Sequence, residues 1–73
     1  MMTPTDALAL AIEKAGSQSA LARHCDKKQG HVWHWLHKSG KCPAEETLKI
    51  EALTGVSRSL LRPDIYPPEA LSA

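Results

Sequence analysis

Polar and basic side chains gather between residues 28 and 38, in a stretch without any acidic residue. Lysine donates hydrogen bonds to phosphate or guanine, and glutamine carries both a donor and an acceptor with which it can address N6 and N7 of adenine. Histidine adds a charge that depends on pH. These side-chain types predict a surface that contacts DNA. Its members are Lys28, Gln29, Gly30, Trp33, His34, His37 and Lys38.

Histidine and cysteine in the same region raise the question of a zinc site. His31, His34 and His37 are evenly spaced, and Cys25 and Cys42 flank them. A zinc finger needs closely paired ligands such as C-x2-C, and the sequence contains no such pair. We therefore predict no metal and no other cofactor, with Cys25 as a small buried hydrophobic residue.

Several other function classes are excluded by what the sequence lacks. It contains no G-x-S-x-G, no H-E-x-x-H and no glycine-rich phosphate loop, so we predict that the protein is not an enzyme. No apolar run approaches the ~20 residues that span a bilayer. No basic segment followed by an apolar one opens the chain. We therefore expect a cytoplasmic protein without membrane contact.

The net charge of +1 is distributed unevenly along the chain. Residues 23–41 hold five lysines and arginines against one aspartate, a balance of +4, whereas the remainder holds four against seven acids, a balance of −3. All four histidines also lie in the basic segment. A domain with one positive end can place that end on the phosphates of DNA.

The spacing of apolar residues predicts that two short helices, about 18–24 and 28–37, present this surface. Apolar positions lie four residues apart on one face of the first helix and follow an i, i+3, i+4 pattern on the second. A small alanine leaves room for the two helices to cross closely. The arrangement is a helix-turn-helix motif. Its inward positions are Leu21, Ala22, Cys25, Val32, Trp35 and Leu36.

Capping residues predict three further helices and no strand, so the expected fold class is all-α with five helices. Thr3 can cap a helix at the start of the sequence, before the helix-turn-helix motif, and Gly16 ends that helix. Pro43 opens a fourth helix, which Gly55 ends. Ser57 can cap one last helical turn.

The C-terminal segment differs in composition from the rest of the chain. Three prolines fall within six positions from Pro63, so we expect residues 63–73 to form an extended tail after a domain of residues 1–62. Ile65 and Tyr66 are available to dock onto that domain.

Residues spread over most of the chain carry a family resemblance: Gln18, Leu21, Ala22, Val32, Trp35, Pro43, Ala44, Glu45, Ile50, Glu51, Thr54, Gly55 and the ending LRPDIYP at 61–67. In this order they resemble the small Cro-like phage and prophage regulators, most of all the YdaS-like subgroup, over about residues 5–68. The resemblance implies a lambda-repressor/Cro-like domain that binds double-stranded DNA at a palindromic operator. It also implies a homodimer, at least on DNA.

The resemblance assigns roles to individual residues. The N-terminal base-reading positions fall on residues 28–30, and we expect Gln29 to read adenine. Gln18 begins the preceding helix, where it can meet a phosphate or simply cap the helix. The other interpretation of Lys28 and Gln29 is a solvated helix start. The complete predicted DNA-binding set is Gln18, Lys27, Lys28, Gln29, Gly30, Trp33, His34, His37 and Lys38.

The turn of the motif departs from its usual pattern of glycine followed by a branched aliphatic residue. Asp26 takes the place of glycine, and aspartate tolerates the left-handed region. Lys27 replaces the aliphatic residue and removes one core contact. Gly30 is unusual in a recognition helix, where it costs ~1 kcal/mol relative to alanine, and it can permit a close approach of the backbone to DNA.

Two features leave alternatives open. Trp33 lies about 160° around the helix from Trp35, so it either offers an apolar plate to a thymine methyl or sugar, folds back over the domain, or meets a partner. The fourth helix has two apolar faces, of which one should complete the core while the other packs under the C-terminal segment or forms a dimer surface. The first face holds Ala44, Leu48 and Ala52, and the second holds Ile50 and Leu53.

These observations favour a repressor that occupies an operator. The rival hypothesis is an antitoxin-like module that binds a toxin or co-regulator through Trp33 and the face formed by Ile50 and Leu53. The outward histidines add a hypothesis that DNA affinity rises as pH falls, because each new cation attracts phosphate.

Overall fold

The computed structural model describes residues 2–67, and this part of the chain is built from helices. Within these residues five α-helices and one short π-helix follow one another without any strand, which confirms the predicted all-α fold. The elements are α1 Pro4–Ala15, α2 Gln18–His24, α3 Gln29–His34, η1 Trp35–Ser39, α4 Ala44–Thr54 and α5 Arg58–Leu61.

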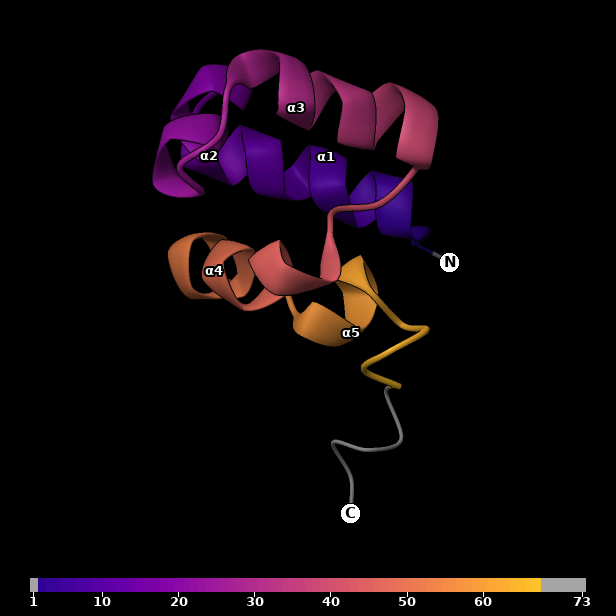
Figure 1. The fold of residues 1–73 in the computed structure, drawn as a ribbon. Coiled ribbons are helices and arrows are strands. Elements are labelled where there is room, and N and C mark those ends of the chain that lie inside the picture. The colour runs from indigo at the N-terminus through magenta and orange to yellow at the C-terminus, as the bar shows by residue number, and fades with distance from the viewer. Residues whose placement is uncertain (1, 68–73) are drawn as a thin grey trace.

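The first helix, α1, lies in the middle of the domain, with α2 and α3 on one side of it and α4 and α5 on the other (Figure 1). It contacts α2, α4 and α5 directly. Its buried face consists of Ala7, Leu8 and Ala11, each with no exposed surface. Because two of these three residues are alanine, neighbouring helices can pack closely against α1 from both sides.

Side-chain caps fix the helix boundaries that the sequence predicts. Thr3 Oγ1 accepts the backbone N–H of Asp6 at 3.1 Å, and Asp6 Oδ2 accepts that of Thr3 at 3.1 Å, a reciprocal capping box. Ser17 Oγ accepts the N–H of Ala20 at 3.0 Å and starts α2. Gly16, with φ of 110°, ends α1 in a conformation that few other residues adopt.

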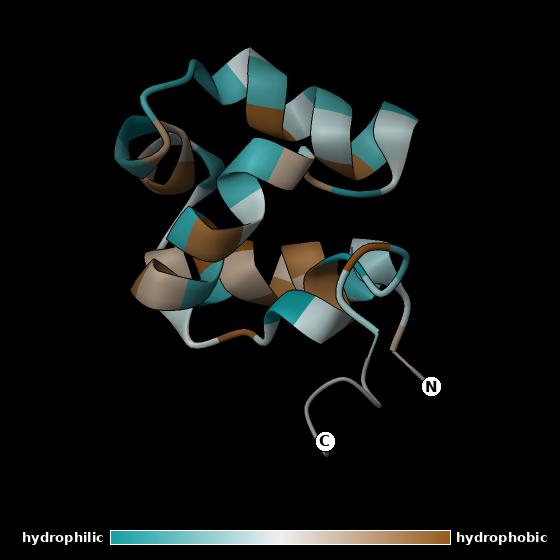
Figure 2. Cartoon of the chain, turned by 60° about the horizontal axis from the view of Figure 1, so that its bottom comes forward, coloured by the Kyte–Doolittle hydropathy of each residue, from teal (hydrophilic) through white to brown (hydrophobic). Residues whose placement is uncertain are grey.

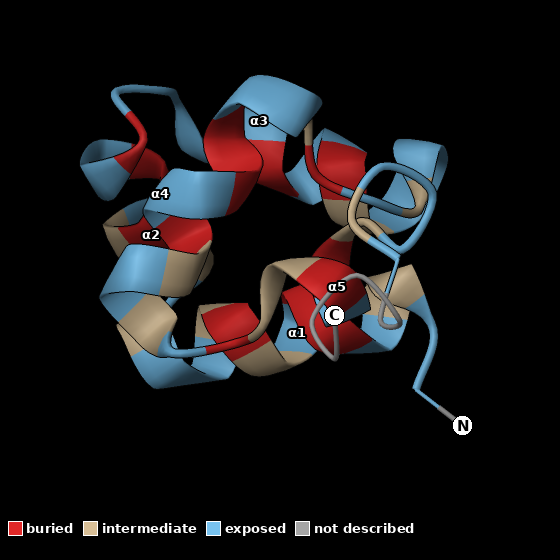
Figure 3. Ribbon diagram, turned by 90° about the horizontal axis from the view of Figure 1, so that it is seen from below, coloured by how far each residue is buried: buried red, intermediate tan, exposed pale blue. Residues whose placement is uncertain are grey.

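The hydrophobic faces of the helices meet in one core, where apolar and buried residues coincide (Figures 2 and 3). Complete burial of an aliphatic side chain contributes about 1.5–3 kcal/mol relative to leaving it exposed. The large aliphatic residues with no exposed surface are Leu8, Leu21, Val32, Ile50 and Leu61.

The buried face of α4 matches neither apolar face that the sequence offers. Ile50 enters the core, but Leu48 and Leu53 remain 47% and 42% exposed. The other buried residues of α4 are the polar residues Glu46 and Thr47. Thr47 can be buried because its hydroxyl donates to the carbonyl of Pro43 at 3.0 Å.

The last turn of the helix predicted over residues 28–37 is wider than a regular α-helix. We expected one helix over 28–37, whereas α3 begins at Gln29 and its continuation η1 is a π-helix. The π spacing brings Ser39 Oγ within 3.4 Å of His34 Nδ1, five residues earlier. Gly40 ends the helix with φ of 77°, and its carbonyl accepts the hydroxyl of Thr5 at 2.7 Å.

The segment after α5 does not run straight on from Pro63 as the prolines suggested. Instead the N–H groups of Ile65 and Tyr66 both donate to Arg62 O, at 3.2 and 2.9 Å, and close a turn. Tyr66 is half-buried, with the guanidinium of Arg58 5.6 Å from its ring centroid, whereas Ile65 stays 43% exposed. The rest of the predicted tail, residues 68–73, lies outside the described residues.

Candidate nucleic-acid interface

The turn between α2 and α3 is a Schellman motif that sets the angle of the recognition helix. Asp26 has φ of 58°, and its N–H donates to Arg23 O at 3.2 Å. The N–H of Lys27 reaches Ala22 O at 2.8 Å. Asp26 therefore holds the usual place of glycine, as the sequence predicts, because aspartate is among the residues that visit this region.

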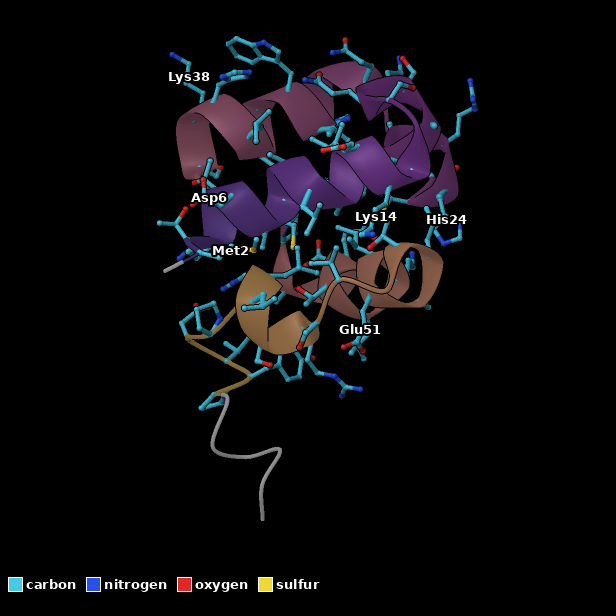
Figure 4. All side chains as sticks on the ribbon, turned by 180° about the vertical axis from the view of Figure 1, so that it is seen from behind. Met2, Asp6, Lys14, His24, Lys38 and Glu51 are labelled. Carbon is cyan, nitrogen blue, oxygen red and sulfur yellow. The ribbon has the colours of Figure 1, made fainter. Side chains whose placement is uncertain are left out.

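The recognition helix, defined here as α3 and η1 together, buries one face and presents the other. Val32 has no exposed surface and Trp35 only 7%, so they anchor the helix from behind. Figure 4 shows Lys38 at the outer edge, pointing away from the domain. Of the predicted DNA-binding set, Gln18 is half-buried and the exposed members are Lys27, Lys28, Gln29, Gly30, Trp33, His34, His37 and Lys38.

The two glutamines of the predicted site touch each other across the motif. Gln29 Nε2 donates to Gln18 Oε1 at 2.6 Å, so the first residue of α3 is linked to the first residue of α2. This hydrogen bond leaves the Oε1 acceptor and the second N–H of Gln29 free. Those two groups are what a bidentate contact with adenine requires. The sequence placed both residues at the site but did not predict that they are paired.

Trp33 and His37 form a tilted aromatic pair on the outward face. Their ring centroids are 4.7 Å apart and their planes are inclined by 39°. Trp33 nevertheless remains 44% exposed. The indole therefore does not fold back over the domain, which removes one of the three possibilities that the sequence left open.

His31 has a structural role at the start of the helix. Its Nδ1 accepts the backbone N–H of Lys28 at 3.1 Å, which satisfies one of the donors that every helix N-terminus leaves free.

Two open hollows, of about 470 and 270 Å³, flank the recognition helix and share His34 and Trp35 in their walls. The larger is also lined by Lys28, Gly30 and His31, and the smaller by Ser39, Lys41, Cys42, Pro43 and Arg62.

Lys27 is the lysine of the predicted set that an acidic side chain engages. Its Nζ lies 3.7 Å from Glu46 Oε2, and Glu46 is only 2% exposed. Lys49 approaches the other oxygen of the same carboxylate at 3.3 Å, without the geometry of a hydrogen bond. Two lysines thus balance one buried carboxylate between the turn of the motif and α4.

Arg62 supports the site in a way that the sequence analysis missed. Its guanidinium donates two hydrogen bonds, of 3.0 and 2.8 Å, to the carboxylate of Asp64, and a third, of 2.9 Å, to the carbonyl of Cys42. The chain after α5 is thereby fastened to the loop that follows the recognition helix. These contacts hold the pKa of Asp64 well below its usual range, at about 2. The sequence signal for this ion pair was the spacing of Arg62 and Asp64 in the LRPDIYP ending.

Both cysteines belong to the core. Burial raises the pKa of the Cys25 thiol and likewise that of Cys42, which disfavours the reactive thiolate. Across residues 2–67, no three histidine, cysteine or acidic side chains converge as metal ligands would. In the same range no helix combines the length and apolarity needed to cross a membrane.

The packed α2 and α3, the Schellman turn between them and the outward polar face together define a helix-turn-helix domain. A family model described as Bacterial toxin YdaS matches residues 8–70. The Cro protein from prophage element Xfaso 1 in Xylella fastidiosa strain Ann-1 has a similar solved structure, with a TM-score of 0.75 and 39% sequence identity. That match covers 81% of this chain and 92% of the Cro chain. No curated protein sequence matches.

The chain therefore belongs to the YdaS family, and it is of the Cro-like phage and prophage type. The resemblance carried by the helix-turn-helix residues and the LRPDIYP ending is confirmed.

Proposed function

We propose that this protein is a sequence-specific transcriptional regulator that binds double-stranded DNA. It represses a promoter by occupying an operator, with the recognition helix in the major groove. The observation that carries the proposal is the hydrogen bond between Gln18 and Gln29. It fixes an amide at the exposed start of the helix with one donor and one acceptor still free.

The charges around this amide support the same function. Lys28 and Lys38 lie at the two ends of an exposed helical face that has no acidic residue. Cations in these positions can bind the phosphates on either side of a groove, while Gln29 reads a base edge. His34 and His37 lie between them and can add charge in acidic solution. Gln18 orients Gln29 and approaches a phosphate from the start of α2.

The regulator acts as a homodimer on a palindromic operator in the cytoplasm, at the nucleoid. A twofold dimer places its two recognition helices about 34 Å apart, which is one turn of DNA. In the Xylella structure the matched protein is named a Cro protein, and this likeness supports the assignment to the repressor class. The exposed Leu48 and Leu53 of α4 offer apolar surface for a second copy.

A gel shift with duplexes from the DNA that flanks the gene of this protein tests the proposal. We expect retention of one duplex, and Gln29→Ala or Lys28→Ala should weaken its binding by about fivefold or more, since a good base contact is worth ~1–3 kcal/mol. Lys14→Ala is the matched control, because it removes the same charge from α1, away from the recognition helix (Figure 4). The absence of any preferred duplex in dilute buffer would reject the function.

A second candidate is an antitoxin-like module that binds a toxin or co-regulator. The family model, described as a bacterial toxin, leaves this candidate open. Trp33 and Leu53 would form the contact, but Ile50, which we expected beside Leu53, is fully buried and cannot take part. Under this candidate, Gln29→Ala would leave partner binding unchanged, and Trp33→Ala or Leu53→Ala would abolish it.

A further inference from the structure

The exposed indole of Trp33 is the least expected feature of the outward face. The other tryptophan, Trp35, is 7% exposed and serves the core, whereas Trp33 keeps 44% of its surface open to solvent. An exposed indole offers a large apolar area that a bound partner can cover. One side of the indole already has a neighbour, because the ring of His37 packs against it at a tilt with a centroid distance of 4.7 Å.

The side of the indole toward the start of the helix is open. Gly30, three residues before Trp33, has no side chain, and a Cβ built there would meet nothing within 4 Å. Gln29, four residues before Trp33, lies on the same side of the helix and about 6 Å along its axis. Along its outward face, the recognition helix therefore presents the amide of Gln29, then the open space at Gly30, and then the apolar ring of Trp33.

The surroundings of this ring indicate which kind of apolar group covers it. The helix carries lysines and histidines and no acid, so its outward face suits a polyanion better than the apolar surface of a protein. Within the major groove, the apolar group that distinguishes one base from the others is the 5-methyl of thymine. An indole one turn from an adenine-reading amide lies within a base pair or two of the contact that the amide makes.

We infer that Trp33 is a specificity-determining residue that packs against a thymine 5-methyl group in each half-site, next to the base pair read by Gln29. This inference rests on the proposed DNA-binding function. His37 acts as a positioning residue: its ring packs against the indole at a tilt and limits its rotation, so the apolar surface is in place before DNA arrives.

The experiment removes the methyl groups one at a time. A preferred 24-base-pair duplex is selected from a random library with the wild-type protein, and each thymine is then replaced by uracil, which lacks only the methyl. Binding is measured by fluorescence anisotropy at fixed salt. Burial of one methyl contributes ~0.8 kcal/mol, so one thymine in each half-site should lose about fourfold in affinity.

Variants of Trp33 and His37 test whether that loss of affinity comes from the contact between Trp33 and the methyl group. In Trp33→Ala the same uracil duplex should bind as well as the thymine duplex, whereas Trp33→Phe should keep part of the difference. His37→Phe retains an aromatic ring and should retain the discrimination, and His37→Ala should reduce it. Leu60→Ala is the matched control, because it removes another exposed apolar side chain but from α5. Thermal unfolding verifies that each variant folds.

The outcomes separate this inference from the function on which it rests. Specific binding that is equally tight for every uracil duplex would overturn the role of Trp33 and leave the regulator intact. A uracil effect that persists unchanged in Trp33→Ala would assign the methyl contact to another residue and overturn it as well. If the selection enriches no duplex at all, both the function and the inference fail.

Discussion

Lys27 Nζ lies 3.7 Å from a carboxylate oxygen of Glu46, and this pair joins the turn of the helix-turn-helix motif to α4. The lysine side chain is 37% exposed and the glutamate 2%. Because the acid is buried, removing a cation beside it costs more than breaking a pair in water. Lys27 thus has a structural role beside Glu46 in addition to the DNA contact predicted for it.

Replacing Lys27 and Lys28 separately should distinguish these roles. We expect Lys27→Met to lower the free energy of unfolding by about 1 kcal/mol, between the values for exposed and buried pairs, and to change the salt dependence of DNA binding little. Lys28→Met should leave stability unchanged and reduce the log–log salt slope by about one, the effect of one lost phosphate contact. Urea unfolding and anisotropy titrations measure the two quantities. Equal slopes for both variants would show that Lys27 leaves Glu46 when DNA binds.

The pairing of Gln18 with Gln29 predicts energetic coupling in DNA binding. Gln18→Ala should weaken operator binding several-fold, because Gln29 loses the partner that orients it. In the Gln29→Ala background the same change should have a smaller effect, limited to any phosphate contact of Gln18 itself. A double-mutant cycle measures the difference. Strict additivity would mean that the 2.6 Å hydrogen bond has no role in recognition.

The parts of the fold that could be predicted from the sequence depend on local chemistry. The hydroxyls of Thr3 and Ser17 bond to N–H groups three residues away, so the caps follow from short stretches of sequence. The left-handed turn at Asp26 and the inward Trp35 are also local consequences of residue type and helical spacing. The position of the recognition helix could therefore be inferred without any long-range contact.

The parts that could not be predicted depend on residues far apart in the chain. Nothing in the local sequence indicates that Glu46 is buried, and it is buried beside Lys27 and Lys49, which approach its carboxylate. Hydrophobicity alone consequently offered two apolar faces for α4, and neither of them is the face that is buried. The packing of His37 against Trp33 is local, but it depends on ring orientations that residue spacing does not determine.

Gly30→Ala should affect stability and DNA binding in opposite directions. A Cβ at this position meets nothing in the protein, so the gain in helix propensity, up to ~1 kcal/mol, should raise the melting temperature by about 4–8 °C. The added methyl should weaken operator binding if the backbone approaches DNA closely. Gly40→Ala is a contrasting control and should destabilise the fold, since Gly40 has φ of 77° and its Cβ would lie 3.3 Å from Thr5 Oγ1. Unchanged DNA affinity in Gly30→Ala would refute the close approach.

Acid should loosen the connection between the C-terminal turn and the recognition helix. Arg62 lowers the pKa of Asp64 from 3.8 to about 2 in the folded protein. A depressed folded-state pKa stabilises the fold above the unfolded value, and this contribution is lost as pH falls from about 4 toward 2. Asp64→Asn should lack that part of the pH dependence, whereas Glu13→Gln, which changes a carboxylate outside any ion pair of the described residues, should retain it. Urea midpoints between pH 5 and 2 provide the comparison.

DNA affinity should rise between pH 8 and pH 6, and the histidines of the recognition helix should contribute unequally. His34 and His37 are exposed on the outward side, so a proton on each adds a cation that can meet phosphate. The log–log salt slope should then steepen by up to about two, one for each new contact. His31 is different, because its Nδ1 already accepts the N–H of Lys28, and a proton there would break that cap.

The double variant His34→Gln with His37→Gln should therefore lose the rise in affinity, while His31→Gln should keep it and lower stability instead. Anisotropy at fixed salt, with circular dichroism at each pH to verify folding, measures both effects. Equal affinity of the wild-type protein at pH 6 and pH 8 would contradict the prediction. The same result would place His34 and His37 out of reach of phosphate, with His37 acting solely as the support of Trp33.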